Sequence, residues 1–242
     1  MSAIFATDNL VDIVYPESDG KPMAENTLQY EWIVMIKGGL DAVLPNDFVA
    51  GDLLWYPVEG KPKIAQAPDV MVAIGRPKGH RRSYLQWQEE HIAPQVVFEI
   101  LSPGNTASEM TKKELFYNEH GVEEYYLYDP EKNDLFGWIR SEKGLTAIPA
   151  IDTWTSPRLG IRFERTPETL IIFRPDGRRF ETFAELEARA EAEHQRAEAE
   201  AQRAEAEAQR AQQALSQIEQ ERLITERLKQ KLLELGIDPE TV

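Results

Sequence analysis

Two acidic residues stand inside apolar, β-branched stretches of this chain, and a lysine follows them. Asp69 opens the stretch DVMVAI, Glu99 lies within VVFEIL, and Lys113 falls in a stretch with helical character. A carboxylate inside a strand is costly to desolvate unless another group compensates its charge. Two carboxylates that hold a divalent cation, with a lysine beside them, neutralise a phosphodiester and position the attacking water. The three residues therefore predict metal-dependent phosphodiester hydrolysis.

Each acid also has a purely structural interpretation. Asp69 follows Pro68 and would cap a turn there, whereas Glu99 would pair with an arginine such as Arg81. Either explanation is adequate for one residue, and an acid pair of this kind is a weak signal by itself. Both interpretations stay open until the surrounding sequence is considered.

The composition limits the kind of metal and the kind of partner. The chain has no cysteine, so thiolate sites are excluded and oxygen ligands favour Mg²⁺ or Mn²⁺. The four histidines show no ligand spacing, and we expect no metal ligand among them. The net charge of −15 argues against tight non-specific DNA binding, which relies on many contacts from Lys and Arg. One basic cluster, Lys78, Arg81 and Arg82, is the candidate nucleic-acid contact, with a solvated loop as the alternative.

The order of predicted elements is that of a mixed α/β sheet flanked by helices. The stretch 95–101 is almost continuously apolar, which is typical of a strand buried on both faces. A helix over 109–120 ends before Gly121, and a strand over 122–128 follows it. Around this unit we expect a helix over 23–43 and strands over 48–57, 69–74, 135–140, 144–149, 159–163 and 170–173.

The character of the sequence changes at Thr182, which begins a capping-box pattern with Glu185. Ala, Glu, Gln and Arg then dominate, without Gly or Pro until Gly236, and RAEAEAQ occurs twice in succession. Apolar residues recur every seven positions and form a narrow seam of coiled-coil type. We therefore expect a globular domain over 1–180, a long helix over 181–242, and a homodimer formed through that helix. A single free helix is the alternative, because these residues are strong helix formers.

Nothing in the sequence points to a membrane or to secretion. The first residues lack a basic segment followed by an apolar one, so they do not match a signal peptide. No stretch approaches the ~20 apolar residues of a membrane span. Together with the missing cysteines, this predicts a cytoplasmic protein with no membrane partner.

Several short motifs follow one another in order between residues 15 and 185. They are Pro68-Asp69-Val70, Phe98-Glu99-Ile100-Leu101-Ser102-Pro103, Lys113 with Tyr117, Gly121-Val122-Glu123-Glu124-Tyr125 and Asp129-Pro130, flanked by Pro22-Met23-Ala24-Glu25-Asn26 and Ser156-Pro157-Arg158-Leu159-Gly160. Together they resemble the putative restriction endonuclease family, also called the Uma-two family, of the PD-(D/E)xK nuclease superfamily.

The resemblance implies a restriction-endonuclease-like fold and metal-dependent cleavage of nucleic acid, which we take to be DNA. Asp69 and Glu99 match the two acids, and the backbone carbonyl of Ile100 is implied as a further metal ligand. The superfamily's lysine stands two residues after the second acid, where this chain has Leu101. The family resemblance places the lysine on the following helix instead, at Lys113.

Two more acids are candidate contributors to the site. Glu109 lies one helical turn before Lys113 and would orient that lysine. Glu25, expected on the first helix, is a further acidic candidate. The competing function is a non-catalytic, nuclease-like interaction module that dimerises or binds partners through its C-terminal helix. The acidity, the displaced lysine and the long helix favour that alternative.

Overall fold

The protein is described from a computed structural model, which defines residues 13–18, 20 and 24–236. Its contacts divide the chain into two units, Met1–Phe183 and Ala184–Val242, and each is described by itself. Among the described residues, the first unit contains all the strands and two of the three α-helices, and the second contains nearly all of the third. The mixed α/β sheet with helices and a long C-terminal helix predicted from the sequence is confirmed.

A six-stranded mixed sheet forms the centre of the first unit, in the order β1-β3-β5-β6-β7-β8. Only the β5–β6 pair is parallel, and helix α2 makes the crossover between these two strands. The elements are β1 Phe48–Gly51, β3 Val70–Ala73, β5 Val96–Ile100, α2 Ala107–Glu119, β6 Glu124–Asp129, β7 Asp134–Ser141 and β8 Gly144–Ala147. Two small sheets accompany it, a parallel pair of β2 Trp55–Tyr56 with β4 Tyr84–Leu85 and an antiparallel pair of β9 Arg162–Arg165 with β10 Leu170–Phe173.

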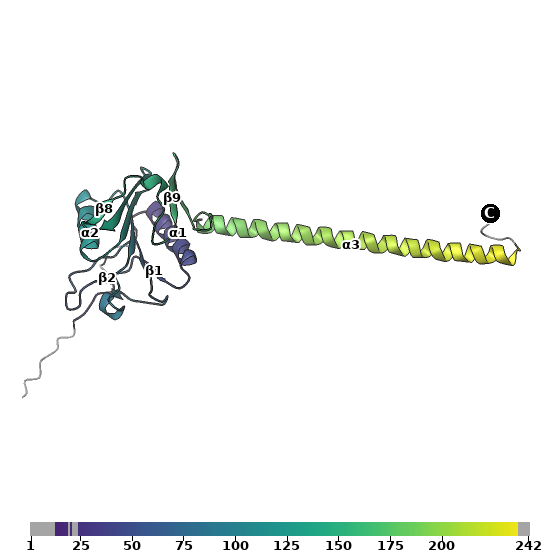
Figure 1. The fold of residues 1–242 in the computed structure, drawn as a ribbon, viewed down its shortest axis with the longest axis horizontal. Helices are drawn as coiled ribbons and strands as arrows, with labels where there is room; N and C mark the ends of the chain where they lie inside the picture. The colour runs from purple at the N-terminus through teal and green to yellow at the C-terminus, as the bar shows by residue number, and fades with distance from the viewer. Residues whose placement is uncertain (1–12, 19, 21–23, 237–242) are drawn as a thin grey trace, which may run out of the picture. The chain divides into compact units, whose positions relative to one another are not determined.

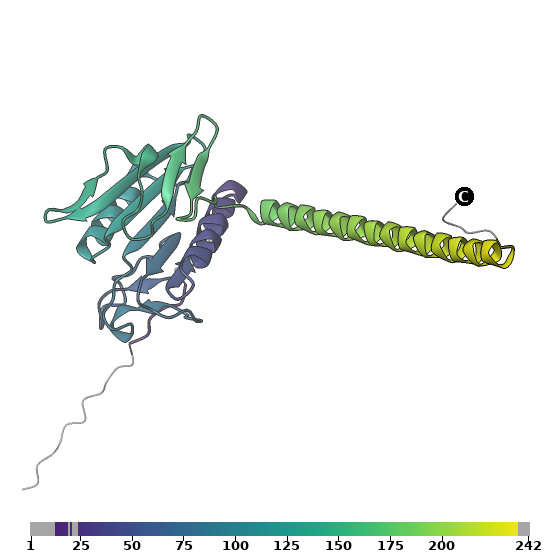
Figure 2. The same cartoon turned by 45° about the vertical axis from the view of Figure 1, so that its right-hand side comes forward.

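The sheet lies between two layers (Figures 1 and 2). Helix α1, Thr27–Val43, packs with β9 and β10 on one face, and α2 packs on the other, so two hydrophobic cores are formed. Strand β5 is buried at all five positions, because successive side chains point alternately into the two cores. The continuous apolar run of the sequence is thereby explained.

Helix α1 begins four residues later than expected and continues through its two glycines. Asn26 is the N-cap, and its side chain accepts a hydrogen bond from the backbone N–H of Gln29. Near the other end of the helix, the ring of Phe180 packs so closely over Gly39 that a Cβ there would collide with it, whereas a Cβ on Gly38 would meet nothing within 4 Å. The glycine pair therefore admits an aromatic ring and does not end the helix.

Other boundaries shift for local reasons. Helix α2 starts at Ala107 because Thr106 and Glu109 form a capping box, and it is followed by Gly121 at φ +92°. The single strand expected over 48–57 is split into β1 and β2, because Asp52 takes a left-handed conformation with φ +47°. Strand β9 begins at 162 and not at 159.

The second unit consists of helix α3, Phe183–Glu234, with Gly236 at φ +77° behind it. Its 52 residues give a rod of roughly 78 Å at ~1.5 Å per residue. None of its side chains is buried. The sequence offers Gly236 and Pro239 as residues that end this helix, and Pro239 lies outside the described residues. In the part of the chain that the structure describes, no helix is long and apolar enough to span a bilayer.

Candidate active site

Asp69, the residue just before β3, lies across from Glu99 on the neighbouring strand β5. Strands β3 and β5 are antiparallel with Val70 paired to Phe98, and continuing this register by one residue sets Asp69 across from Glu99. Side chains alternate along a strand, so both acids point to the face where α2 packs. The register of one strand pair therefore brings together two acids that are 30 residues apart in the sequence.

Glu99 is held by two residues of α2. The ammonium of Lys113 donates to Glu99 Oε2 at 2.6 Å, and the hydroxyl of Tyr117 donates to Oε1. The side chain of Glu99 is only 2% exposed, and that of Lys113 is 18% exposed. Burial lowers the pKa of Lys113, but the attraction of Glu99 and Asp69 outweighs it and raises the pKa above its ordinary value. Lys113 stands on α2 and not at the superfamily's usual position two residues after the second acid. It nevertheless contacts Glu99, and it does so in its charged form.

Asp69 has no cation of its own among the described residues. Its Oδ2 accepts a hydrogen bond of 2.7 Å from the backbone N–H of Ile100. Burial, followed by the repulsion of Glu99, raises the pKa of Asp69 to about 8, against the opposing effects of Lys113 and the Ile100 N–H. Two buried carboxylates share one ammonium, so the ionised site has one negative charge in excess.

The carbonyl of Ile100 is fixed by the first turn of α1. Gln29 Nε2 donates to this carbonyl at 2.8 Å, and Gln29 Oε1 accepts from the backbone N–H of Glu25 at 2.8 Å. Gln29 is buried, so its amide bridges the start of α1 and the end of β5. A carbonyl oxygen has two lone pairs, and one remains for a further ligand.

Glu25 lies just before α1 and not on it, because the helix begins at Thr27. Its Oε2 accepts a hydrogen bond from the hydroxyl of Ser102, in the turn after β5. The carboxylate approaches this turn closely, since a Cβ on Gly104 would collide with it. Glu25 therefore reaches the turn that follows Glu99, and its catalytic contribution stays a prediction.

Glu109 has a structural task at the start of α2. Its carboxylate accepts from the backbone N–H of Thr106 at 3.2 Å in the capping box. Its charge also contributes to the raised pKa of Lys113. An electrostatic influence on the lysine is thus present, and the orienting role stays a prediction.

The donor set fits a hard divalent cation. Within residues 13–18, 20 and 24–236, no group of three or more His, Cys, Asp or Glu side chains is placed to hold a metal ion. The available donors are two carboxylates and one backbone carbonyl, all of them oxygen. Mg²⁺ is commonly bound through one or two carboxylates and keeps several waters. The negative charge in excess at Asp69 and Glu99 is what such a cation would neutralise.

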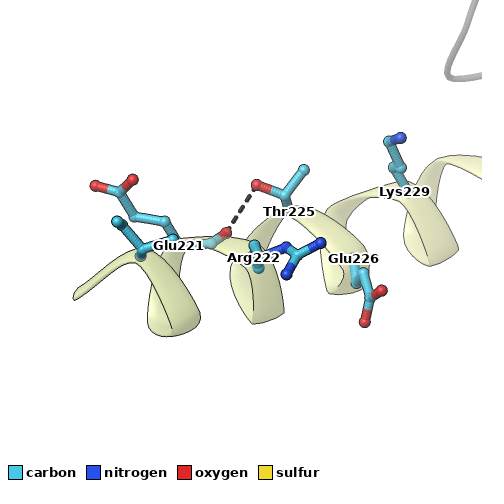
Figure 3. A pocket seen from close by; sticks show the side chains of 6 residues that line it. Glu221, Arg222, Thr225, Glu226 and Lys229 are labelled. Atoms are coloured by element: carbon cyan, nitrogen blue, oxygen red, sulfur yellow. Dashed lines mark hydrogen bonds between the residues drawn. The ribbon is translucent and has the colours of Figure 1, made fainter. Parts of the chain in front are cut away.

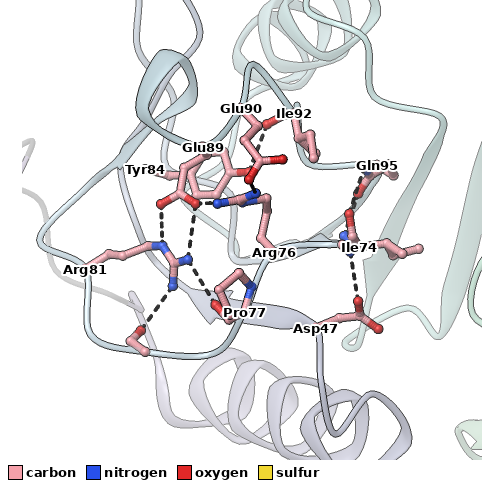
Figure 4. Close-up of polar contacts among 12 residues, drawn as sticks. Asp47, Ile74, Arg76, Pro77, Arg81, Tyr84, Glu89, Glu90, Ile92 and Gln95 are labelled. Carbon is pink, nitrogen blue, oxygen red and sulfur yellow. Dashed lines mark hydrogen bonds and ion pairs between the residues drawn. The ribbon is translucent and has the colours of Figure 1, made fainter.

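The predicted basic contacts are engaged with acids. Arg81 donates to both oxygens of Glu89 and lies over the ring of Phe48, 3.9 Å from its centroid. Arg76 donates to the same carboxylate at 3.0 Å (Figure 4). Burial would raise the pKa of Glu89, but hydrogen bonds from the two arginines lower it below its ordinary value. Arg76 also pairs with Glu90 at 2.6 Å, so the two arginines and the two glutamates balance each other in this part of the chain.

The other two basic residues also have acidic neighbours. Lys78 donates to the Asp41 carboxylate at 3.0 Å, and Arg82 donates to Glu17 at 2.9 Å. The Arg82 pair is highly exposed, and such pairs contribute little energy. Contact of Lys78, Arg81 and Arg82 with nucleic acid stays a prediction, and Arg82 is the one whose charge is least engaged.

Sequence reasoning did not assign Tyr117 and Gln29 to the site. Tyr117 belongs to a sequence motif together with Lys113, and it packs in the core while its hydroxyl holds Glu99. Gln29 occupies a buried position three residues before Trp32 and four before Ile33, on the apolar stripe of α1. A polar residue on that stripe was the available signal. For Tyr117 the spacing of four residues from Lys113 was the signal.

Comparison with known proteins identifies the family. The sequence model of the Uma2 family, described as "Putative restriction endonuclease", matches residues 39–168. The chain belongs to the Uma2 family. The match spans Asp69, Glu99 and Lys113, and the resemblance seen in the sequence is confirmed. For this Uma2 protein, as for its family, nucleic acid is the substrate class that the family description supports.

Solved structures were compared as well. A crystal structure described as "a putative nuclease belonging to DUF820" from Anabaena variabilis aligns with a TM-score of 0.43 at 20% sequence identity. The alignment covers 58% of this chain and 77% of that one. No curated protein matches the sequence.

Proposed function

We propose that this Uma2 protein is a metal-dependent endonuclease that hydrolyses phosphodiester bonds in DNA. The observation that carries the proposal is the pair of buried carboxylates, Asp69 and Glu99, that share the single cation Lys113. A buried excess of negative charge is unfavourable unless a cation binds beside it. The family description supports the reaction class, and the oxygen donors support Mg²⁺ or Mn²⁺.

In this proposal Asp69, Glu99 and the carbonyl of Ile100 hold the metal ion. When bound, the ion supplies charge neutralisation at the phosphate and lowers the pKa of a coordinated water. Asp69 is kept in place by the Ile100 N–H, and the Ile100 carbonyl by Gln29. The chain therefore holds its metal-binding groups through hydrogen bonds of its own backbone and side chains.

Lys113 has the second role in the proposed reaction. Its ammonium is charged and is held at 2.6 Å from Glu99 Oε2, so it is a hydrogen-bond donor fixed beside the acids. A fixed cation stabilises negative charge that develops at a phosphate and orients an attacking water. Leu101, at the usual lysine position, cannot do either, because its side chain carries no donor.

Calorimetry and a nicking assay test the proposal together. Wild type, Asp69→Asn, Glu99→Gln and the control Glu124→Gln would be titrated with Mn²⁺ and incubated with supercoiled plasmid. We expect binding and nicking in wild type and in the control, and loss of both in the two site variants. No binding and no nicking in any protein would favour the interaction module as the function.

We further propose that the protein acts in the cytoplasm as a homodimer joined through α3. Large apolar side chains on the C-terminal half of α3 are more than half exposed, namely Leu215, Ile218, Leu223, Ile224, Leu228 and Leu233. An open pocket along this helix is lined by Ile218, Glu221, Arg222, Thr225, Glu226 and Lys229, and Figure 3 draws these side chains. Residues 218, 221, 222 and 225 have the spacing of the four residues that receive one side chain in a coiled coil. Two active sites in one dimer would suit cleavage of both DNA strands.

Sedimentation velocity tests the dimer with the full chain. Ile218→Glu and Leu228→Glu place charges on the apolar side of α3, and Gln217→Glu adds the same charge at a polar position. We expect monomers for the first two variants and dimers for wild type and the control. A monomeric wild type at micromolar concentration would refute this part of the proposal without affecting the nuclease assignment.

A further inference from the structure

The two contacts that α2 makes with Glu99 are divided between the two oxygens of its carboxylate. Lys113 takes Oε2 and Tyr117 takes Oε1, and the two residues lie one turn apart on the helix. A carboxylate held at one oxygen still turns about its last torsion, which has a broad energy profile. Donors on both oxygens fix the plane of the group.

Burial makes the second donor necessary. Glu99 is 1% exposed, so water cannot supply the missing hydrogen bonds. Lys113 satisfies one oxygen, and without the Tyr117 hydroxyl the other would lose its only donor within the described residues. Each carboxylate oxygen accepts two hydrogen bonds, so the clamp leaves acceptor capacity on both for a further partner.

Tyr117 is itself fixed at both ends. Its backbone carbonyl accepts from the N–H of Val122 at 3.1 Å and from Arg140 Nη2 at 3.3 Å. Its ring is fully buried and lies 5.2 Å from the ring of Tyr125 and 5.9 Å from that of Phe116, measured between centroids. The hydroxyl therefore reaches Glu99 from a rigid base.

Tyr125 offers an internal control for this arrangement. It belongs to the same core, is 1% exposed, and stacks on Trp138 at a centroid distance of 4.9 Å. Its hydroxyl has no hydrogen-bond partner in the described part of the chain. Deleting a hydroxyl from each tyrosine therefore separates the bond to Glu99 from the packing of the ring.

We infer that Tyr117 is a positioning residue of the active site, whose hydroxyl fixes the plane of the Glu99 carboxylate so that Glu99 can bind a divalent metal ion. This inference rests on the proposed function. Partners that orient a metal ligand typically contribute 10-fold to 100-fold to metal affinity or activity. The loss of Tyr117's hydroxyl should act on metal binding and turnover, and not on the affinity for DNA.

The test compares Tyr117→Phe and Tyr125→Phe with wild type in the full chain. For Tyr117→Phe we expect Mn²⁺ affinity about tenfold weaker and a lower kcat with KM for plasmid unchanged. For Tyr125→Phe we expect both quantities within about twofold of wild type. Equal effects of the two substitutions, or no effect of Tyr117→Phe, would overturn the inference.

A metal-free measurement keeps the inference distinct from the proposed function. Urea unfolding without metal is measured for the four proteins of a double-mutant cycle of Tyr117→Phe and Glu99→Gln. A hydrogen bond from a hydroxyl to a carboxylate stabilises the fold more than one to an amide. Tyr117→Phe should therefore shift the unfolding equilibrium about fivefold more when residue 99 is glutamate than when it is glutamine. A coupling factor near one overturns the inference even when wild type cuts DNA. Strong coupling in a protein that neither binds Mn²⁺ nor nicks DNA supports the positioning of Glu99 and refutes only the proposed function.

Discussion

Two fully buried glutamates on neighbouring parallel strands have very different surroundings. Glu99 on β5 faces α2, where it meets Lys113 and a second acid, Asp69. Glu124 on β6 belongs to the opposite face, in line with Tyr126. Both residues are 1% exposed. Burial of an acid is therefore common to both places and does not mark a site.

The partners of the two glutamates explain the difference. Glu124 accepts from the hydroxyls of Tyr126 and Ser156 and from the backbone N–H of Arg158, all of them neutral donors. These bonds fasten the turn before β9 to the sheet, and no second acid takes part in them. Around Glu99 the charges do not balance once Asp69 is ionised, because two carboxylates then share one lysine. A cation is therefore expected at Glu99 and not at Glu124.

Loss of activity should give the largest contrast. Glu99→Gln and Asp69→Asn each remove a charge that the proposed metal ion needs, so we expect plasmid nicking to fall ~100-fold or more. Glu124→Gln keeps an acceptor for its neutral donors and should retain activity within about threefold. Initial rates with Mn²⁺ measure this. An equal loss in all three variants would show that the two glutamates are not functionally distinct.

Stability, unlike activity, should depend strongly on Glu124. Glu124→Ala leaves three donors without their acceptor, namely the O–H groups of Tyr126 and Ser156 and the backbone N–H of Arg158, which we expect to cost about 3 kcal/mol or more of unfolding free energy. Glu123→Ala is the matched control, because Glu123 pairs with Arg158 near the surface and such pairs contribute about 1 kcal/mol or less. Urea unfolding monitored by tryptophan fluorescence gives both values. A control as destabilised as Glu124→Ala would contradict this prediction.

The comparison of the two glutamates also predicts that metal binding beside Glu99 releases a proton. Asp69 has a pKa of about 8 in the folded, metal-free protein, so it is largely protonated at pH 7. Binding of Mn²⁺ at pH 7 should therefore release close to one proton, and almost none at pH 9.5. Calorimetry in two buffers of different ionisation enthalpy counts the protons. Glu124→Gln should release the same number, whereas a wild type without proton release would indicate that Asp69 is ionised before the metal arrives.

The same shift sets a pH dependence of stability. The folded pKa of Asp69 lies above its ordinary value of 3.8, so the folded state binds the proton more tightly than the unfolded state does. Its contribution to stability is fully present below about pH 4 and is lost as the pH rises toward 8. Relative to wild type, Asp69→Asn should become more stable over this range, by at most about 1.4 kcal/mol per pH unit. Thermal melts without metal at pH 5, 6, 7 and 8 would measure the trend, and a constant difference would contradict it.

The smallest effects should come from substituting two glycines of α1. This helix packs on the same face of the sheet as Glu124, and neither substitution touches an acid. Gly39→Ala places a Cβ against the ring of Phe180 and should cost about 1–3 kcal/mol. Gly38→Ala meets no atom and should stabilise the helix by about 0.5–1 kcal/mol. Urea unfolding of the pair calibrates packing changes on this face. Nicking rates should be unchanged in both, in contrast to the acid variants.

Much of the fold and part of the site could be predicted from the sequence. The stretch 95–101, the helix after it and the long C-terminal helix are local patterns of apolar spacing and helix formers, and they were found close to their observed positions. Boundaries were less accurate at the start of α1, after Asn26, and between β1 and β2, at Asp52. Asn26 is a cap-type residue and Gly51-Asp52 is a turn-prone pair, so the sequence marks both places, but apolar spacing alone does not fix where the element begins or breaks.

Contacts between distant segments could not be derived from the sequence pattern. The bond from Lys113 to Glu99 requires α2 to pack over β5, and only the resemblance to the family indicated it. The neutralisation of Arg81 by Glu89 was missed, because a basic cluster in a loop gives no sign of the acids that fold onto it. Glu124 was not distinguished from its partly exposed neighbour Glu123 for the same reason.

The position of Lys113 has a consequence for recognising distant relatives. A lysine two residues after the acid is tied to one strand and tolerates no change in spacing. A lysine on a separate helix is tied to the face of that helix, and its interval from the acid also depends on the length of the turn between the strand and the helix. Searches that fix the interval between acid and lysine would overlook such proteins. A search for three side chains in space, an aspartate across from a glutamate that a helical lysine contacts, would find them at any interval.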